Sequence, residues 1–513
     1  MNVGVAIHAH ARSRPQATAG FDGRRSLTYR ELDRRTNRLA NLLTGAFGVR
    51  PGDRVAVLLQ NRLEVLESLG ACAKARAVYC GLNFRMSLGE YQAIFDNARP
   101  KALITQAEFA ETAAALAEEF GVPVIDVDDA SERGYGALAS AADTAPASLH
   151  QGTPDDDFCI VYTSGTTGAP KGILFDARAV SQHAMVAGLE YGMTSESRWL
   201  TTIPHNSSVQ ITLAPSLFLG GAVGFLDGRG FDPERFAAEA TAQRATHTYL
   251  VPTMLYRLLE AGLDRSRLAT LTSIGYGAAP ISPDRVVELV GRFGPVFSQL
   301  YGMAEVASIA TMLRQPEHKL IGDGDTHLAT SCGQPSYLVD VRVVDDNGND
   351  AGPGERGEVL FHTPYAMREY YRDPERTSGT LVDGWVHSGD IGQWDERGYL
   401  HIVDRKKDLI IRGGYNIAPS EIENVLFRHP AVLEAAVVGL PDAEWGEAVV
   451  AAVALREGHT LDAAAVREWC RGEGLPSIKV PERLITLDTL PKNPVGKIAK
   501  REVVALATRK ERP

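Results

Sequence analysis

Residues 162–173 read Tyr-Thr-Ser-Gly-Thr-Thr-Gly-Ala-Pro-Lys-Gly-Ile, and the interpretation of the whole chain starts from this stretch. Its serine and threonines supply hydroxyl donors, and its glycines let the backbone bend so that N–H groups point inward. Lys171 adds a positive charge. A polar surface turn is the alternative, but a turn needs only about four residues and does not require a lysine. The stretch therefore predicts a polyphosphate-binding loop.

The loop differs from the Walker loop of nucleoside triphosphatases. Gly168 is followed by Ala169 instead of lysine, and Lys171 is not followed by the serine or threonine that binds magnesium. The stretch instead resembles the phosphate loop of the adenylate-forming superfamily, which includes acyl- and aryl-CoA ligases, peptide-synthetase adenylation domains and luciferases. Members activate a carboxylate with ATP to an acyl-AMP and then pass the acyl group to a thiol.

The resemblance implies that the nucleotide is held by seven residues of this loop. They are Thr163, Ser164, Gly165, Thr166, Thr167, Gly168 and Lys171.

Composition limits the other classes of function. The chain has 513 residues, 44% of them hydrophobic, which is enough for more than one core. Its net charge of −11 makes nucleic acid a poor partner. The five cysteines lack metal-ligand spacing, so we expect reduced thiols in a cytoplasmic protein. No apolar run approaches the roughly 18 residues of a membrane span, so we expect no membrane partner.

Helix and strand patterns alternate in the first part of the chain. Thr28 and Glu31 form a capping box before one helix, a strand pattern follows over 55–59, and a second helix is predicted over about 62–77. A further strand, 158–162, leads directly into the loop. This predicts an α/β domain with a largely parallel sheet, and it places the loop at the carboxyl end of a strand, where such sheets bind ligands.

The pattern changes after Gly333 to short strands, which predicts a small β subdomain. The charged segment Asp404–Asp408 resembles the junction between the two domains of the family. The resemblance implies an N-terminal adenylation domain over 1–404, which binds ATP and the acid, and a small, mobile α+β domain over 405–513.

The segment Thr201–Gln210 is predicted to be a polar turn before an apolar stretch. A lone histidine is more often structural than functional, but the family places a Pro-x-x-His or Pro-x-Phe-His element here to line the acyl pocket. This chain departs from that element because Pro204 directly precedes His205. The His205-Asn206 pair is similar to members that activate aryl acids. The resemblance implies a catalytic and acid-binding His205, with Asn206 and Ser208 in the acid pocket.

Residues 272–282 predict a strand that runs into a turn of small residues, and a Gly-Ala-Ala-Pro sequence on its own could be an ordinary turn. In the family this motif brackets the adenine, which here implies Gly277, Ala278, Ala279 and Pro280. The preceding Gly275 and Tyr276 would wall the acid pocket.

Residues 299–305 form the next motif, Gln-Leu-Tyr-Gly-Met-Ala-Glu. By resemblance Tyr301 stacks on adenine, Gly302 borders the nucleotide, and Met303 borders the acid. Glu305 is implied as a catalytic residue and as the magnesium ligand, for which one carboxylate beside phosphate oxygens suffices. Ala304 stands where most acyl-CoA ligases have threonine. Several aryl-acid ligases have alanine at this place, so this departure also favours an aromatic acid.

Four later residues complete the resemblance. Asp390 would accept hydrogen bonds from the ribose hydroxyls, and Arg405 would reach the ribose or a phosphate. Gly414 would let the pantetheine arm of CoA pass close to the backbone. Lys497, in Leu-Pro-Lys-Asn-Pro-Val-Gly-Lys, would be the catalytic lysine that bridges the carboxylate and the α-phosphate. Each alone could be a turn or surface residue, but together they follow the order of the family.

The predicted function is an ATP-dependent acid–CoA ligase that uses Mg²⁺ and acts on an aromatic or other compact carboxylic acid. One alternative is a stand-alone adenylating enzyme that loads a carrier protein or another nucleophile such as an amine. A second alternative is a non-catalytic nucleotide-binding protein, against which the retained charged residues argue. The sequence leaves the acid and the oligomeric state open, and a homodimer is compatible with it.

Overall fold

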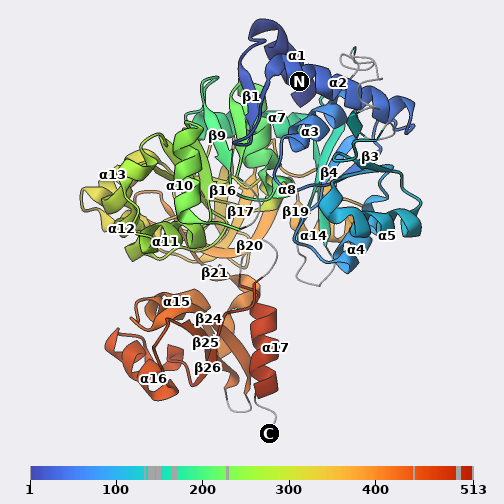
Figure 1. Cartoon of the computed structure of the whole chain (residues 1–513). Coiled ribbons are helices and arrows are strands. Elements are labelled where there is room, and N and C mark those ends of the chain that lie inside the picture. The colour runs from blue at the N-terminus through green and yellow to red at the C-terminus, as the bar shows by residue number, and fades with distance from the viewer. Residues whose placement is uncertain are drawn as a thin grey trace. The chain divides into compact units, whose positions relative to one another are not determined.

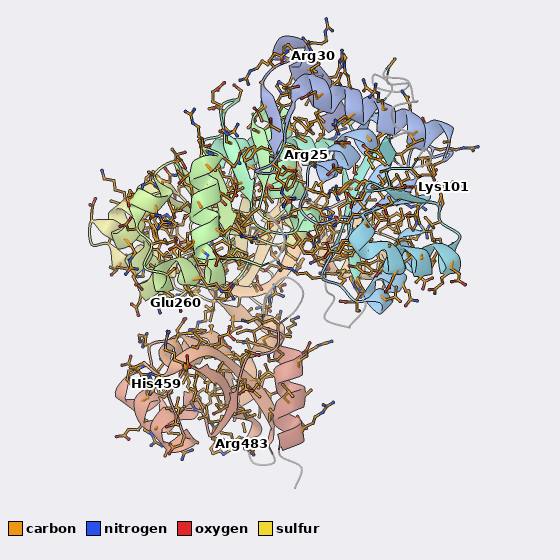
Figure 2. All side chains as sticks on the ribbon, in the orientation of Figure 1. Arg25, Arg30, Lys101, Glu260, His459 and Arg483 are labelled. Carbon is orange, nitrogen blue, oxygen red and sulfur yellow. The ribbon has the colours of Figure 1, made fainter. Side chains whose placement is uncertain are left out.

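The computed structural model describes residues 2–131, 135–136, 145, 152–163, 170–226, 230–442, 445–492 and 498–510. The chain divides into two compact units (Figure 1). Unit 1 comprises Met1–Val341 and Phe361–Val386, and unit 2 comprises Arg342–Leu360 and His387–Pro513. Side chains fill the space between helices and sheets in each unit (Figure 2).

One sheet of unit 1 contains the two strands on either side of the predicted phosphate loop, β7 and β8. Among the described residues, seven strands form it in the order β18-β8-β7-β4-β3-β5-β6. The five strands β7, β4, β3, β5 and β6 run parallel, whereas β8 and β18 are antiparallel to their neighbours. The bounds are β3 Arg54–Leu58, β4 Val78–Gly81, β5 Ala102–Thr105, β6 Val124–Asp126, β7 Asp157–Thr163, β8 Lys171–Asp176 and β18 Glu369–Tyr370.

A second sheet of unit 1 contains nine strands among the described residues, in the order β15-β14-β13-β12-β11-β9-β10-β1-β2. Its centre is parallel, and both edges end in antiparallel strands. The bounds are β1 Thr18–Phe21, β2 Ser26–Thr28, β9 Arg198–Thr201, β10 Ala222–Phe225, β11 His247–Leu250, β12 Ser273–Gly277, β13 Phe297–Tyr301, β14 Thr311–Leu313 and β15 Gln334–Pro335.

Helices cover these sheets with their apolar faces. Against the seven-stranded sheet, Ile94 and Phe95 of α4 and Leu116 of α5 pack with Leu58 and Leu103 in one buried cluster. Figure 1 shows α4 and α5 side by side and α10 to α13 grouped together. The bounds are α1 Val3–Ser13, α2 Tyr29–Gly45, α3 Glu64–Ala75, α4 Leu88–Ala98, α5 Ala110–Phe120, α7 Ala177–Glu190, α8 His205–Ser208, α9 Ala214–Leu219, α10 Pro233–Ala242, α11 Pro252–Glu260, α12 Pro283–Phe293, α13 Gln315–Gly322 and α14 Pro374–Thr380.

Unit 2 is built around a long hairpin. Its strands β24 (Val432–Asp442) and β25 (Gly446–Leu455) are antiparallel, and β26 (Arg483–Leu487) pairs in parallel with β25. The apolar run in β25 is buried on both faces: Val449 and Val453 pack with the cluster that includes α15, and Val450 packs with the cluster that includes α17.

The other elements of unit 2 are shorter. They are β21 Leu400–Arg405, β22 Ile410–Arg412, β23 Tyr415–Ile417, α15 Pro419–Phe427, α16 Ala463–Gly472 and α17 Lys500–Lys510. The strands β16 Asp340–Val344, β17 Gly357–His362 and β20 Trp385–Trp394 cross from one unit to the other, and β19 Leu381–Val382 pairs with the start of β20.

The predicted α/β class is confirmed, with parallel sheets in the larger part and a small α+β part towards the C-terminus. The capping box at Thr28 and Glu31 is present, and it starts α2. The domain boundary at residue 404 stays a prediction. All five cysteines are buried free thiols. In the part of the chain that the structure describes, no helix is both long and apolar enough to cross a membrane.

The prediction of a polar turn over 201–210 is wrong. His205–Ser208 form the helical turn α8, which continues as a π-helix over Val209–Leu213. His205, Asn206, Ser208 and Gln210 of this segment are buried. Helical hydrogen bonds pair the backbone groups of a buried segment, and the apolar residues that follow favour burial of this one.

Candidate active site

The two strands that flank the predicted phosphate loop pair antiparallel. Thr163 at the end of β7 lies opposite Lys171 at the start of β8. Ser164, Gly165, Thr166, Thr167 and Gly168 lie outside the described residues. The Thr163 hydroxyl is buried and has no hydrogen-bond partner among the described residues. Buried polar atoms usually have a partner, so a ligand at the base of the loop suits this hydroxyl.

Lys171 and Glu305 form a close ion pair, and the Tyr370 hydroxyl is hydrogen-bonded to both side chains. The Lys171 ammonium lies 2.5 Å from Oε1 of Glu305, and it donates to the Tyr370 hydroxyl at 3.2 Å. That hydroxyl donates to the same Glu305 oxygen at 2.5 Å. The Lys171 ammonium also lies 5.0 Å from the centre of the Tyr370 ring, a cation–π contact.

Backbone pairing brings these three residues together. Glu305 lies in a 3-10 turn over Ala304–Val306 just after β13, and its carbonyl accepts from the Met367 amide at 2.7 Å. Tyr370 in β18 pairs with Ile173 in β8. Sequence reasoning missed Tyr370 because it lies 65 residues from Glu305 along the chain, and no local spacing marks that contact.

The donor set fits a magnesium ion. The Glu305 side chain is 3% exposed, and Mg²⁺ prefers carboxylate oxygens together with water and phosphate oxygens. In the structure the Lys171 ammonium pairs with this carboxylate. A cation at Glu305 would replace the ammonium as the partner of the carboxylate, and Lys171 would then be available to a phosphate. The two residues can therefore serve the roles that the family resemblance implies.

Tyr370→Phe is expected to raise the Mg²⁺ concentration needed for half-maximal activity about tenfold, because the hydroxyl fixes the carboxylate before the metal arrives. Burial and the neighbouring Glu305 carboxylate hold the pKa of Tyr370 well above its usual value, so the hydroxyl keeps its proton and donates. The measurement is a Mg²⁺ titration of adenylation. Tyr371→Phe is the matched control, since its ring contacts arginines instead. Equal Mg²⁺ requirements in wild type and Tyr370→Phe would contradict the prediction.

The predicted adenine-binding residues lie on one edge of the nine-stranded sheet. Parallel pairing aligns Gly277 of β12 with Leu300 of β13, so the turn after β12 and the residues Tyr301, Gly302 and Met303 leave the sheet at the same edge. A Cβ at Gly277 would lie 2.3 Å from the Leu300 carbonyl oxygen, and only glycine fits there. Ala278 has φ of 65°, an unfavourable angle for alanine. Ala278 and Pro280 are exposed, and Ala279 is half-buried.

Gly275 and Tyr276 face opposite sides of β12, as successive strand residues must. The Tyr276 hydroxyl is 2.9 Å from Nε2 of His318, on the side covered by α13. A Cβ on Gly275 would lie 2.8 Å from the ring of Tyr191, on the other side. The Tyr276 side chain therefore lies on the face opposite the one that Gly275 borders, and their part in an acid pocket stays a prediction.

His205, Asn206 and Ser208 are all buried in α8. Nδ1 of His205 is hydrogen-bonded to the Tyr79 hydroxyl at 2.8 Å, and Ser208 donates to the His205 carbonyl at 3.1 Å. The side-chain oxygen of Asn206 is buried without a hydrogen-bond partner among the described residues, so it suits a ligand that presents a hydrogen-bond donor. Burial lowers the pKa of His205 to about 4, so the imidazole is neutral near pH 7 and acts as a hydrogen-bonding group.

Buried histidines make the stability of this protein sensitive to acid. Burial lowers the pKa of His183 to about 3 and that of His205, His247 and His318 to about 4, from 6.5. Below pH 6.5 the unfolded chain takes up protons that the folded chain does not, so this stability is present above pH 6.5 and is lost as the pH falls toward 4.

Each of these histidines lowers the free energy of unfolding by up to about 1.4 kcal/mol for each unit that the pH falls between these pKa values. The melting temperature is therefore expected to fall by several degrees from about pH 7.5 to about pH 5. His205→Gln should reduce this dependence. Equal melting temperatures at the two pH values would contradict the assignment of neutral, buried imidazoles.

Four predicted residues fall within the residue range of unit 2, whereas Lys171 and Glu305 belong to unit 1. Asp390 lies opposite Arg405 across β20 and β21, and its carboxylate is 3.1 Å from Nε of Arg405. Gly413 and Gly414 form a two-residue hairpin between β22 and β23, with φ of 55° and 83°. The positive φ angles of this turn are enough to explain both glycines. The passage of pantetheine at Gly414 therefore stays a prediction. Lys497 lies outside the described residues.

A lysine at a strand start, paired with a buried glutamate in an α/β fold of parallel sheets, is typical of a nucleotide-dependent enzyme. Two family models match the chain: "AMP-binding enzyme" over residues 7–371 and "AMP-binding enzyme C-terminal domain" over residues 421–497. The chain belongs to the AMP-binding enzyme family, which confirms the predicted superfamily.

Curated relatives match nearly the full chain. Feruloyl-CoA synthase of Amycolatopsis sp is 38% identical and covers 96% of both chains. Indoleacetate–CoA ligase of Aromatoleum aromaticum is 34% identical and covers 98% of both chains. The fatty acid–[acyl-carrier-protein] ligase ScoC of Streptomyces coeruleorubidus is 34% identical over 96% of this chain and 94% of its own.

Solved structures agree in fold. ATP-bound MatB from Rhodopseudomonas palustris has a TM-score of 0.88 at 30% identity, covering 100% of this chain and 99% of its own. The amide bond synthetase McbA from Marinactinospora thermotolerans has a TM-score of 0.86 at 32% identity, covering 98% and 99%. o-Succinylbenzoate CoA synthetase from Bacillus subtilis, in complex with an acyl-adenylate intermediate, has a TM-score of 0.86 at 28% identity, covering 97% of both chains.

Proposed function

We propose that this protein is an AMP-forming acid–CoA ligase that activates an aromatic or other compact carboxylic acid. The observation that carries the proposal is the ion pair between the half-buried Lys171, at the start of β8, and the buried Glu305. It joins a phosphate-binding cation to a magnesium-binding carboxylate. Relatives named for feruloyl-CoA and indoleacetate–CoA support an aromatic acid.

Two displacements make up the proposed reaction. A carboxylate oxygen of the acid attacks the α-phosphorus of ATP, and diphosphate leaves. The thiol of CoA then attacks the acyl carbon, and AMP leaves. Mg²⁺, when bound, supplies positive charge that offsets the charge on the phosphates. Lys171, the Thr163 hydroxyl and the loop hold the phosphates, Glu305 holds the metal, and Lys497 stabilises the charge that builds up at the α-phosphate.

The acid is proposed to lie near Gly275 and Asn206. On its side of β12, Gly275 faces the ring of Tyr191, which packs edge-on against Trp199 with ring centres 5.2 Å apart. These aromatic side chains fill the space beyond the glycine and so favour a short, compact acid over a long chain. The amide oxygen of Asn206, which has no partner among the described residues, is a hydrogen-bond acceptor, so its proposed contact is a donor group on the acid other than the carboxylate.

The proposed division of labour follows the domain boundary at residue 404. Residues 1–404 bind ATP and the acid, and residues 405–513 bring Lys497 for adenylation and Gly414 for thioester formation. The two family models lie on either side of this boundary, which supports it. The buried free cysteines support a cytoplasmic location.

The test is a panel of acids with ATP, Mg²⁺ and each of three acceptors. Ferulate, indole-3-acetate and a series of aliphatic acids are combined with CoA, a phosphopantetheinylated carrier protein or an amine. The expected result is AMP, diphosphate and acyl-CoA, formed fastest from an aryl acid. Faster transfer to the carrier protein or to the amine would favour the alternative acceptors, for which ScoC and McbA give precedents by name.

A further inference from the structure

A cavity of about 370 Å³ opens beside Lys171 within unit 1. It lies between α4, the start of β8 and the connection from β18 to α14. Its volume falls within the range of small-molecule sites. Lys171 lines this cavity and also contacts Glu305, so the cavity adjoins the proposed phosphate site through this lysine.

Three cations and two carboxylates line the cavity. The cations are Lys171, Arg372 and Arg376, and the carboxylates are Asp96 and Asp373. Asp373 pairs with Arg376 at 3.4 Å. Arg372 has no carboxylate partner within the described part of the chain, and its guanidinium donates to the Asn97 carbonyl at 3.1 Å. The lining therefore carries a net positive charge, and the guanidinium of Arg372 keeps donors available for an anion.

The backbone holds Arg372 in this place at a conformational cost. Its φ is 57°, in the left-handed region that favours glycine or asparagine. Neighbouring contacts enforce the turn: the Tyr371 amide donates to the Gly172 carbonyl at 2.8 Å, and Asn97 donates to the Tyr371 carbonyl at 3.0 Å. An ordinary surface turn would be easier to build with glycine. Strained residues that the surroundings hold in place are concentrated at functional sites.

We propose that this cavity binds inorganic diphosphate, the product that leaves when the acid attacks the α-phosphorus. The inference rests on the proposed function. Arg372 and Arg376 supply planar donors that suit phosphate oxygens, and Lys171 connects them to the loop where the diphosphate is released. Asp96 is compatible with this ligand because diphosphate binds Mg²⁺. The ion keeps several water molecules, which can donate hydrogen bonds to the Asp96 carboxylate.

The experiment is calorimetric titration of the full-length protein with inorganic diphosphate, with and without Mg²⁺. The variants are Arg372→Gln and Arg376→Gln. Arg368→Gln is the matched control, because Arg368 precedes the same turn but pairs with Asp157 at 2.9 Å and lies outside the cavity lining. Parallel titrations use AMP and CoA. We expect each cavity variant to bind diphosphate about tenfold more weakly, with AMP and CoA affinities and the Arg368→Gln variant unchanged.

Unchanged diphosphate affinity in both cavity variants would overturn the proposal. An equal loss of diphosphate affinity in Arg368→Gln would also overturn it, because it would indicate a general effect of charge. So would an equal loss of AMP affinity in the cavity variants, which would indicate the nucleotide site, or a loss of CoA affinity alone, which would indicate binding of the phosphates of CoA. The titration needs neither acid nor ATP turnover. If the wild type adenylates no acid of the panel and yet its diphosphate binding depends on Arg372 and Arg376, the proposed function fails and the anion site stands.

Discussion

Lys497→Ala is expected to reduce acyl-adenylate formation by about 10²- to 10³-fold, the usual effect of removing one group that stabilises transition-state charge. The family motif around this lysine implies that it reaches the carboxylate and the α-phosphate only during adenylation. Transfer from supplied acyl-AMP to CoA should therefore proceed at nearly the wild-type rate. The two half-reactions are measured separately, as acid-dependent ATP–diphosphate exchange and as acyl-CoA formation from synthetic acyl-AMP.

Lys492→Ala is the matched control for this change. Lys492 lies in the same motif, and its ammonium pairs with Glu434. Its loss should leave both half-reactions within about twofold of wild type, as expected for an exposed ion pair. If Lys497→Ala slowed both half-reactions equally, the lysine would have a general structural role, and the assignment to adenylation would have to be abandoned.

Glu305→Gln is expected to lower kcat/KM for MgATP by about 10²-fold or more, because a neutral amide is a poor magnesium ligand and the metal affinity falls. The substitution also removes the anionic partner of Lys171, which then faces the loop without its buried carboxylate. The measurement is adenylation at several Mg²⁺ concentrations, together with AMP binding in the absence of metal. AMP binding should change little.

Glu190→Gln separates this effect from lost stability. Glu190 is also a buried carboxylate of unit 1, held by Arg314 at 2.7 Å, and breaking a buried pair is costly wherever it lies. We expect it to lower the melting temperature while KM for MgATP stays constant. A Glu305→Gln enzyme with the wild-type Mg²⁺ dependence would exclude Glu305 as the metal ligand.

Local patterns in the sequence predicted most of the fold. The capping box at Thr28 and Glu31 and the strand before the loop are found where they were expected, because capping and apolar alternation act over a few residues. The polar turn at 201–210 was wrong for the same reason. Polarity near Pro204 indicates a surface turn locally, but burial of His205 depends on its partner Tyr79, 126 residues away.

The candidate site was predicted residue by residue but not as an arrangement. Lys171 was expected to bind a phosphate of ATP, and Glu305 was expected to bind its magnesium ion. The structure pairs them directly, across 134 residues of chain, and adds Tyr370 to the pair. Gly275 and Tyr276 were expected to line the acid pocket without a known side-chain direction, and the alternation of β12 places them on opposite faces of the strand.

The sequence by itself determined the family, the α/β class and the residue types of the loop, because motifs in a fixed order carry that information without any contact between them. Only the tertiary structure decided which of these residues meet. Strand pairing between β8 and β18 places Tyr370 on Lys171, and the turn after β18 aims Arg372 at a cavity that no local pattern marks. Contacts between residues far apart in the chain arise from the packing of whole strands and helices, and a linear pattern does not record them.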